Sequence, residues 1–350
     1  MNLEPLKGVM IGAGYFARFH AEAWRRVEDA RIVAVADVAA GRSEEFSERF
    51  GIARAYHDVT EMLERERPDF VDIVTRSDSH PEIVRFAALH GAQVICQKPM
   101  APSWEECLAM VSACDDAKVR LLIHENWRWQ PWFREVKRLL DRGAIGKPFY
   151  ASFVMRNSDG RGVEPYPAQP YFRSMERLLV YEMVVHFLDT LRFLLGEIES
   201  VFCRMGRVNQ AIKGEDYTLI QLSFGNGACG LIDANRISGP ARREPISEEL
   251  IVEGERGKIR LARDCRIWLD EYGDAEKQLD YRFPAEGYRG DSVHAAQRHF
   301  ISCLRTGQPC ESEGEDYLKT VAAAFACYDS AETGQAASLL SRLPEIKRAG

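Results

Sequence analysis

The chain has 350 residues, enough for about two domains of ordinary size. Its 46% hydrophobic and 28% charged residues are typical of a globular protein with sizeable cores, and a net charge of −7 disfavours a nucleic-acid partner. The sequence shows no apolar leader, no uncharged run long enough to cross a bilayer and no C-x-x-C pair among its nine cysteines. We therefore expect a cytoplasmic protein with reduced thiols and no membrane partner.

A short apolar strand, 9–11, turns directly into a helix-like segment, 15–27. Between them Gly12, Gly14 and Ala17 form the pattern G-x-G-x-x-A. The first glycine permits the sharp turn, the second lets the backbone approach a pyrophosphate, and the small third residue lets helix and strand pack closely. The N-terminus of the helix then presents N–H groups to the phosphates. The pattern predicts a dinucleotide-binding turn.

A second apolar strand, 32–36, ends at Asp37, which lies 23 residues after Gly14. An acidic residue at about 20 residues' distance binds the adenosine ribose hydroxyls in dinucleotide-binding folds. A carboxylate there repels a 2′-phosphate, so we expect NAD as the cofactor, with NADP less favoured although Arg42 lies nearby. The alternative interpretation is a tight turn followed by an ordinary surface aspartate.

Apolar strands then alternate with helices as far as residue 123. The predicted helices are 44–50, 57–66, 82–90 and 104–116, and the predicted strands are 70–74, 93–96 and 119–123. Near-continuous apolar strands separated by helices indicate a parallel sheet covered on both faces. We expect an NAD-binding Rossmann domain, a doubly wound parallel sheet, over residues 1–124.

The pattern changes after His124, where closely spaced strands follow one helix, 131–142. Asn226-Gly227 and Arg256-Gly257 supply hairpin turns. The predicted strands are 149–156, 198–208, 217–224, 228–236, 249–253, 258–262 and 266–269, and the predicted helices are 176–195, 292–305 and 315–334. The chain is therefore an α/β protein whose C-terminal α+β domain, 125–350, carries a large, mostly antiparallel open sheet. Its apolar faces need a cover, so we expect a homodimer or homotetramer through this sheet.

Ligands of an open parallel sheet bind outside the carboxyl ends of its strands. The stretches just past the predicted strand ends are 75–80, 97–99 and 124–128. Lys98 comes directly after a buried strand and is followed by Pro99, so its ammonium group would point into the nicotinamide cleft. A surface lysine at a strand end is the alternative interpretation.

The predicted helix 176–195 is apolar on nearly every side, yet Glu182, His186 and Asp189 fall on one stripe at i, i+4 and i+7. A buried carboxylate and imidazole must be paired or face a polar cavity. The spacing fits both a self-satisfied Glu182–His186 pair and a general acid/base. We expect no metal, because Glu182 and His186 have no third histidine or cysteine at a suitable spacing.

Together these motifs resemble the glucose-fructose oxidoreductase/inositol dehydrogenase/MocA (Gfo/Idh/MocA) family over nearly the whole chain. The specific part is Lys98-Pro99 after the fourth strand, followed by the acid-x-x-x-His helix. The resemblance implies that NAD takes a hydride from a hydroxyl or hemiacetal of a sugar or polyol. In this scheme Lys98 orients the hydroxyl, His186 takes its proton, and Glu182 is the partner of His186 or a substrate ligand. The implied cofactor-binding residues are Gly12, Gly14, Tyr15, Phe16, Ala17, Asp37, Arg42, Thr75, Ser77, His80, Gln97, Lys98, Asn126 and Arg173, and the implied substrate residues are Lys98, Trp127, Arg128, Glu182 and His186.

The chain departs from the family pattern at three positions. The family usually has Glu where this chain has Gln97, Asp where it has Glu182, and often Gly where it has Val184. The run 124–132 resembles a branch that includes D-apiose dehydrogenases, which makes D-apiose a candidate substrate. Trp127 and Trp129 are then either stacking surfaces for a sugar ring or buried anchors. An NAD-using glycosidase and a non-catalytic sugar- or NAD-sensing regulator are the alternative functions of the same fold.

Overall fold

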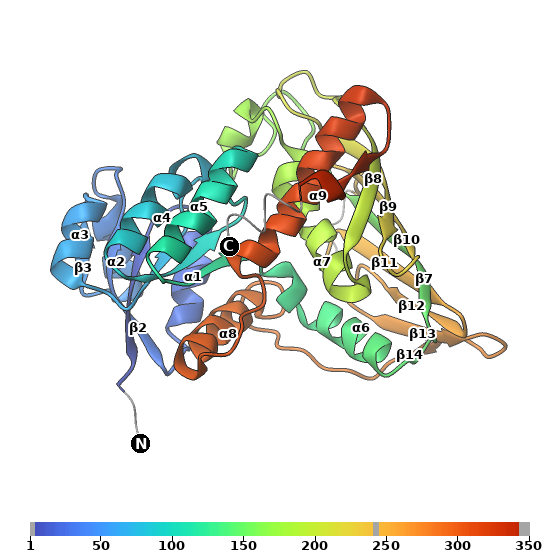
Figure 1. Ribbon diagram of the computed structural model, residues 1–350, viewed down its shortest axis with the longest axis horizontal. Helices are drawn as coiled ribbons and strands as arrows, with labels where there is room; N and C mark the ends of the chain where they lie inside the picture. Colours follow the sequence, from blue (N-terminus) through green and yellow to red (C-terminus); the bar gives the residue numbers. More distant parts are fainter. Residues whose placement is uncertain (1–3, 241–244, 343–350) are drawn as a thin grey trace. The chain divides into compact units, whose positions relative to one another are not determined.

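The computed structural model describes residues 4–240 and 245–342, which form two compact units (Figure 1). The first unit contains residues 4–129 together with Pro284–Leu318. The second contains the described residues of Gln130–Phe283 together with 319–342.

The first unit is built on a six-stranded parallel sheet with the order β3-β2-β1-β4-β5-β6. Its strands are β1 (Leu6–Ile11), β2 (Ala30–Ala36), β3 (Arg54–Tyr56), β4 (Phe70–Ile73), β5 (Gln93–Gln97) and β6 (Leu121–His124). The strand order reverses between β1 and β4, which creates a crevice at the carboxyl ends of these two strands. The predicted Rossmann sheet is confirmed, whereas β3 was missed because three residues are too short for a periodic pattern.

Six helices belong to this unit: α1 (Ala17–Trp24), α2 (Arg42–Phe50), α3 (Val59–Glu66), α4 (His80–Leu89), α5 (Trp104–Asp116) and α8 (Ser292–Thr306). Gly51 ends α2 with a left-handed φ of 68°, and Ser103 with Glu106 forms a capping box at the start of α5. Helix α8 packs on α1, and its Phe300 and Ile301 join the apolar core under the sheet. Residues 284–318, which the sequence analysis assigns to the second domain, therefore pack in the first unit, because α8 buries its apolar face there.

The second unit contains a nine-stranded sheet with the order β14-β13-β12-β11-β7-β10-β9-β8-β15. Its strands are β7 (Pro148–Arg156), β8 (Ile198–Gly206), β9 (Tyr217–Phe224), β10 (Cys229–Asn235), β11 (Glu248–Gly254), β12 (Gly257–Leu261), β13 (Ile267–Glu271), β14 (Lys277–Gln278) and β15 (Ala337–Ser338). Strands β7 and β10 run parallel, and the other neighbouring strands run antiparallel. The predicted mostly antiparallel sheet is confirmed, including the hairpins at Asn226-Gly227 and Arg256-Gly257.

Helices α6 (Pro131–Asp141), α7 (Val185–Leu195) and α9 (Gly314–Thr333) lie over one face of this sheet (Figure 1). Strand β9 shows the consequence: its even-numbered residues are buried and its odd-numbered residues are exposed. Within the described ranges, no helix is long and apolar enough to span a bilayer.

The predicted helix 176–195 starts later than expected and changes type. Its first six residues, Leu179–Val184, form a π-helix that continues into α7. The carboxylate of Glu215 accepts hydrogen bonds from the amides of Leu178 and Val180, at 3.2 and 2.9 Å. A side chain from another segment thus satisfies amides at the start of the helix, and no helical turn forms over 176–178. The wider π-turn also moves Glu182 off the α-helical stripe predicted for it.

Candidate cofactor and active site

The glycine-rich turn lies at the carboxyl end of β1. Gly12 has a φ of +98° and donates its amide to Ala36 O at 2.8 Å, and an added Cβ would lie 2.6 Å from Val74 O. Only glycine fits this position. At Gly14, in contrast, a Cβ would meet nothing within 4 Å, so the backbone borders open space. Ala17, the first residue of α1, is fully buried.

Two aromatic residues of this turn lie in different surroundings. Tyr15 is 46% exposed, and the guanidinium of Arg18 lies 4.5 Å from the centre of its ring. Phe16 instead packs edge-on against Tyr288, with ring centres 5.2 Å apart. Tyr15 is the more exposed of the two, and the half-buried Phe16 also contributes to packing.

Asp37 follows the last residue of β2, and its carboxylate is oriented by main-chain amides. Oδ2 accepts from Ala13 N and Oδ1 accepts from Ala39 N, both at 2.8 Å. Each carboxylate oxygen keeps a lone pair for a further donor. Arg42 is largely exposed, with Nη1 3.9 Å from Asp37 Oδ1. Open backbone at Gly14 and an oriented carboxylate at the next strand end fit a dinucleotide.

The stretch after β4 is fixed by side-chain hydrogen bonds. Ser77 opens a short 3-10 turn, in which Ser79 Oγ donates to Thr75 Oγ1 at 2.7 Å. His80 is fully buried, with Nδ1 3.1 Å from both Pro99 O and Met100 O and Nε2 3.3 Å from Thr75 O. Burial lowers the pKa of His80. The ring joins the loop after β4 to the segment that follows Lys98, so we interpret His80 as a positioning residue.

Lys98 follows β5 and is half-buried, and it influences a carboxyl group that the sequence analysis missed. Glu125 is 1% exposed, and it accepts hydrogen bonds from Trp127 N and from the hydroxyl of Tyr317, both at 3.1 Å. Burial raises the pKa of Glu125 to about 7, against the opposing effect of the Lys98 charge. A carboxyl group that titrates near neutrality thus lies within electrostatic range of Lys98. In the sequence, the only indication that Glu125 belongs to the site is its position directly after a parallel strand.

The three residues after Glu125 are held inside the fold. Asn126 Nδ2 donates to Ser292 Oγ at 2.9 Å, and Arg128 Nη1 lies 3.7 Å from a carboxylate oxygen of Glu311. Trp127 is 2% exposed, with the guanidinium of Arg289 4.2 Å from the centre of its ring. This burial favours the buried-anchor interpretation of Trp127.

Glu182, His186 and Arg173 lie in the second unit. His186 is 3% exposed on α7, and Glu182 is half-buried in the preceding π-helix. Arg173 occupies a 3-10 turn, Pro170–Ser174, and donates Nε to Pro170 O at 3.3 Å. Asp189 is fully buried and accepts a hydrogen bond from Thr320 Oγ1 at 3.0 Å, so its carboxylate joins α7 to α9.

Sequence comparisons identify the family. The oxidoreductase family with an NAD-binding Rossmann fold (GFO_IDH_MocA) matches residues 6–125, and the GFO/IDH/MocA C-terminal domain matches residues 133–260. The D-apiose dehydrogenase of Paraburkholderia graminis is 38% identical to this chain over 97% of the chain and 91% of that protein. The chain belongs to the Gfo/Idh/MocA family.

Two further relatives agree with this assignment. The D-apiose dehydrogenase of Rhizobium rhizogenes is 37% identical, over 96% of this chain and 98% of that protein. An oxidoreductase from Agrobacterium radiobacter, solved with NAD+, L-tartaric acid and magnesium, superposes with a TM-score of 0.90 at 34% identity, covering 97% of this chain and 99% of that one. The predicted family, fold class, oxidoreductase activity and NAD cofactor are confirmed.

The departure from the Gfo/Idh/MocA pattern at Gln97 has a structural explanation. Asp72 Oδ2 accepts from His20 Nδ1 at 2.8 Å, which leaves His20 Nε2 to accept from Gln97 Nε2 at 2.8 Å. The same Gln97 amide donates to His124 Nδ1 at 3.0 Å. All four side chains are buried. A position between two histidine acceptors needs a group with two N–H donors, which glutamine has and glutamate lacks.

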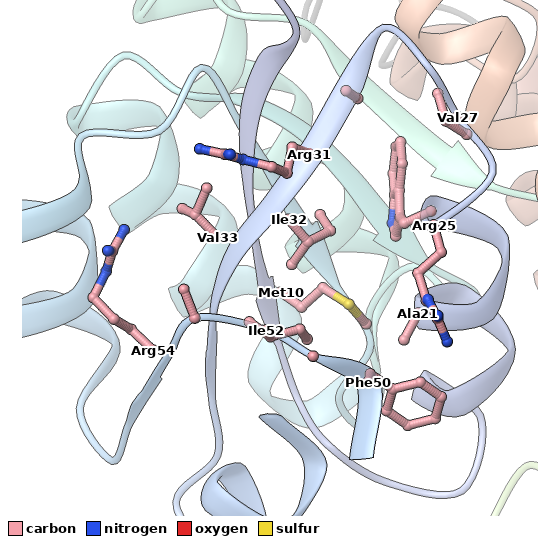
Figure 2. Close-up of a pocket in the computed structure, with 14 residues that line it drawn as sticks. Met10, Ala21, Arg25, Val27, Arg31, Ile32, Val33, Phe50, Ile52 and Arg54 are labelled. Carbon is pink, nitrogen blue, oxygen red and sulfur yellow. The ribbon is translucent and has the colours of Figure 1, made fainter. Parts of the chain in front are cut away.

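A pocket of about 470 Å³ lies elsewhere on the Rossmann unit (Figure 2). Figure 2 shows Met10, Ile32 and Ile52 around its centre and the side chains of Arg31 and Arg54 extending beside it. The pocket is lined by 30–33, the amino end of β2, whereas Asp37 follows the carboxyl end of that strand. It is therefore distinct from the cofactor edge predicted for this family.

Proposed function

We propose that this chain is an NAD-dependent dehydrogenase that oxidises a hydroxyl or hemiacetal group of a sugar or polyol, with D-apiose as the candidate substrate. The observation that carries the proposal is the 38% and 37% identity to two D-apiose dehydrogenases over nearly the full length of both partners. The open backbone at Gly14 and the oriented carboxylate of Asp37 support NAD as the oxidant.

The proposed mechanism rests on one chemical requirement. A secondary alcohol does not release a hydride until its hydroxyl proton is being removed, so a base must stand beside the reacting carbon. We assign this base to His186, with Glu182 as its carboxylate partner, and we assign the orientation of the hydroxyl to Lys98. When bound, NAD accepts the hydride from the same carbon. The charge of Lys98 favours the ionised form of the buried Glu125 carboxyl, so we propose that Glu125 adjusts the charge of the site.

We propose different roles for the other candidate residues. Gly14, Asp37 and Tyr15 are proposed to contact the cofactor, and the exposed Arg42 to lie beside its ribose. Trp127 and Arg128 are proposed to shape the loop that carries Glu125.

The direct test follows NADH absorbance after the protein is mixed with NAD and a panel of D-apiose, other pentoses, hexoses and inositols, then with NADP. We expect turnover with NAD. Lys98→Ala and His186→Ala should each lose about 10²- to 10⁴-fold in turnover, the usual contribution of a general acid or base, while NADH binding survives. The exposed residues Lys147 and His90 provide matched controls, and Lys147→Ala and His90→Ala should retain activity.

Two results would contradict the proposal. Normal rates in both Lys98→Ala and His186→Ala would refute the assigned roles. The absence of NADH formation with every compound of the panel, while NAD still binds, would refute the dehydrogenase activity. Release of free sugar from an aryl glycoside without net NADH would then identify a glycosidase, and binding without any turnover would identify a sensor.

We also propose a homodimer or homotetramer formed through the open face of the nine-stranded sheet. On β9, Tyr217 and Leu219 are 43% and 45% exposed on the face opposite to the helices. Sedimentation at micromolar concentration tests this proposal. Leu219→Glu should shift the protein towards monomer, whereas Glu199→Gln on β8 should not, and a monomeric wild type would contradict the proposal.

A further inference from the structure

A histidine and two cysteines come together at the end of α8, away from the residues of the proposed mechanism. His299 and Cys303 are four residues apart and therefore lie on the same side of this helix. The helix ends at Gly307, whose φ of +71° turns the chain back so that Cys310 returns to the same place. The ligand atoms of the three residues all lie within 4.8 Å of one another, and Cys303 Sγ is 3.4 Å from His299 Nε2.

The separation of 3.4 Å between Cys303 Sγ and His299 Nε2 is close to one edge of a tetrahedral zinc site, and the other ligand atoms lie within 4.8 Å. With Zn–S bonds of about 2.3 Å and Zn–N bonds of about 2.0–2.1 Å, a sulfur and a nitrogen ligand lie about 3.6 Å apart and two sulfurs about 3.8 Å apart. Imidazole and thiolate are also the ligand types that zinc prefers. We propose that His299, Cys303 and Cys310 bind one zinc ion, with water as the fourth ligand.

The imidazole of His299 already has the tautomer that this site requires. Its Nε2 accepts a hydrogen bond from the amide of Glu311 at 2.7 Å, so Nε2 carries the lone pair and Nδ1 carries the proton. The ring is oriented by Trp129, whose ring centre lies 4.7 Å away. Zinc binding at Nε2 would replace the hydrogen bond from the Glu311 amide.

The loop that carries Cys310 is held in place by Arg120. The guanidinium of Arg120 donates to the carbonyl oxygens of Cys303, Gly307 and Gln308, at 3.2, 3.0 and 2.6 Å. Further along, Ser312 O accepts the amide of Ile123 in β6 at 2.9 Å. The loop between Cys303 and Cys310 is thus held by hydrogen bonds to its main-chain carbonyl groups. Arg120 Nη1 also lies 3.9 Å from Cys310 Sγ, where its charge favours a thiolate.

The charges of the proposed site balance. On binding, two S–H bonds break, two Zn–S bonds form, and two protons pass to solvent. One Zn²⁺, two thiolates and a neutral imidazole sum to zero, which suits a site that is largely buried.

A search for C-x-x-C pairs could not find this group. The spacing is H-x₃-C-x₆-C, in which the first interval depends on helix periodicity and the second on the turn at Gly307. The three residues can be recognised as one group only when the helix and the turn at Gly307 have formed.

The experiment uses the full-length, reduced protein with Zn²⁺ as the probe. Chelator-competition titration should give one zinc per chain, and calorimetry in two buffers of different ionisation enthalpy should give about two protons released per zinc. His299→Ala, Cys303→Ser and Cys310→Ser should each bind zinc at least about 10- to 100-fold more weakly. Cys229→Ser, a change at an exposed cysteine on β10, is the matched control and should bind zinc as the wild type does.

A second readout keeps the proposal testable if a variant folds poorly. In the wild type, Co²⁺ should give the visible bands of a tetrahedral site and a thiolate-to-cobalt charge-transfer band, and Zn²⁺ should protect Cys310 from alkylation. Three results would each overturn the proposal: no zinc binding by the wild type, equal binding by the three ligand variants, or a Co²⁺ complex without the thiolate band.

Discussion

Replacing Gln97 by glutamate puts a carboxylate into the middle of the buried series Asp72–His20–Gln97–His124. The amide of Gln97 donates to both histidines, at 2.8 and 3.0 Å, and a carboxylate cannot replace either donor. A buried acceptor that loses its donor costs about 1–3 kcal/mol, so the two together cost about 2–6 kcal/mol of unfolding free energy. The substitution restores the residue usual in the family, yet the partners of Gln97 in this chain predict a destabilised protein.

Urea unfolding at about pH 8, followed by circular dichroism, measures this loss. Gln97→Met is the matched control, because it removes the same donors without adding a buried charge, and its loss should be the smaller one. Equal stability of Gln97→Glu and wild type would refute the proposed hydrogen-bond directions.

Four further substitutions test other parts of the first unit. Gly12→Ala should lower the melting temperature, because the added Cβ would lie 2.6 Å from Val74 O. Gly14→Ala should leave the melting temperature unchanged but weaken NADH binding in a fluorescence titration. Equal melting temperatures of the two variants would refute this contrast. Glu125 has a pKa raised to about 7 from its usual 4.5, so wild-type stability should fall by about 3 kcal/mol as the pH rises from 4.5 to 7, and Glu125→Gln should flatten this dependence in urea unfolding. At Glu66, burial opposes but hydrogen bonds from Arg54, Tyr56 and Lys7 prevail and lower the pKa to about 2. Glu66 stabilisation of about 2–3 kcal/mol should therefore be present above pH 4.5 and lost as the pH falls towards 2, and an acid titration of Glu66→Gln that matches wild type would contradict this.

Local patterns were sufficient to predict most of the fold. Gly12, Gly14 and Asp37 are close enough in sequence that a strand, a turn and a helix determine their positions, and Lys98 follows from the end of an apolar run. The parallel and antiparallel sheets likewise follow from strand spacing and from the intervening helices or hairpins.

The missed features depend on partners distant in sequence. The start of the helix before α7 is set by Glu215. The raised pKa of Glu125 comes from its burial, and its hydrogen-bond partner Tyr317 lies far along the chain. The need for glutamine at position 97 arises from His20 and His124, one on α1 and one at the end of β6. Hydrophobic periodicity carries no information about such contacts.

The return of residues 284–318 to the first unit bears on the order of folding during synthesis. Phe300 and Ile301 complete an apolar core that also contains Met10 and Trp24, so residues near the start of the chain are buried by residues made almost 300 positions later. A Rossmann segment that has just left the ribosome would expose this apolar surface until α8 is synthesised. Domains usually fold as units from the N-terminus, and surface left exposed in the meantime promotes aggregation. The nascent chain should therefore need chaperones until α8 has been synthesised. A fragment ending at residue 129 should be poorly soluble.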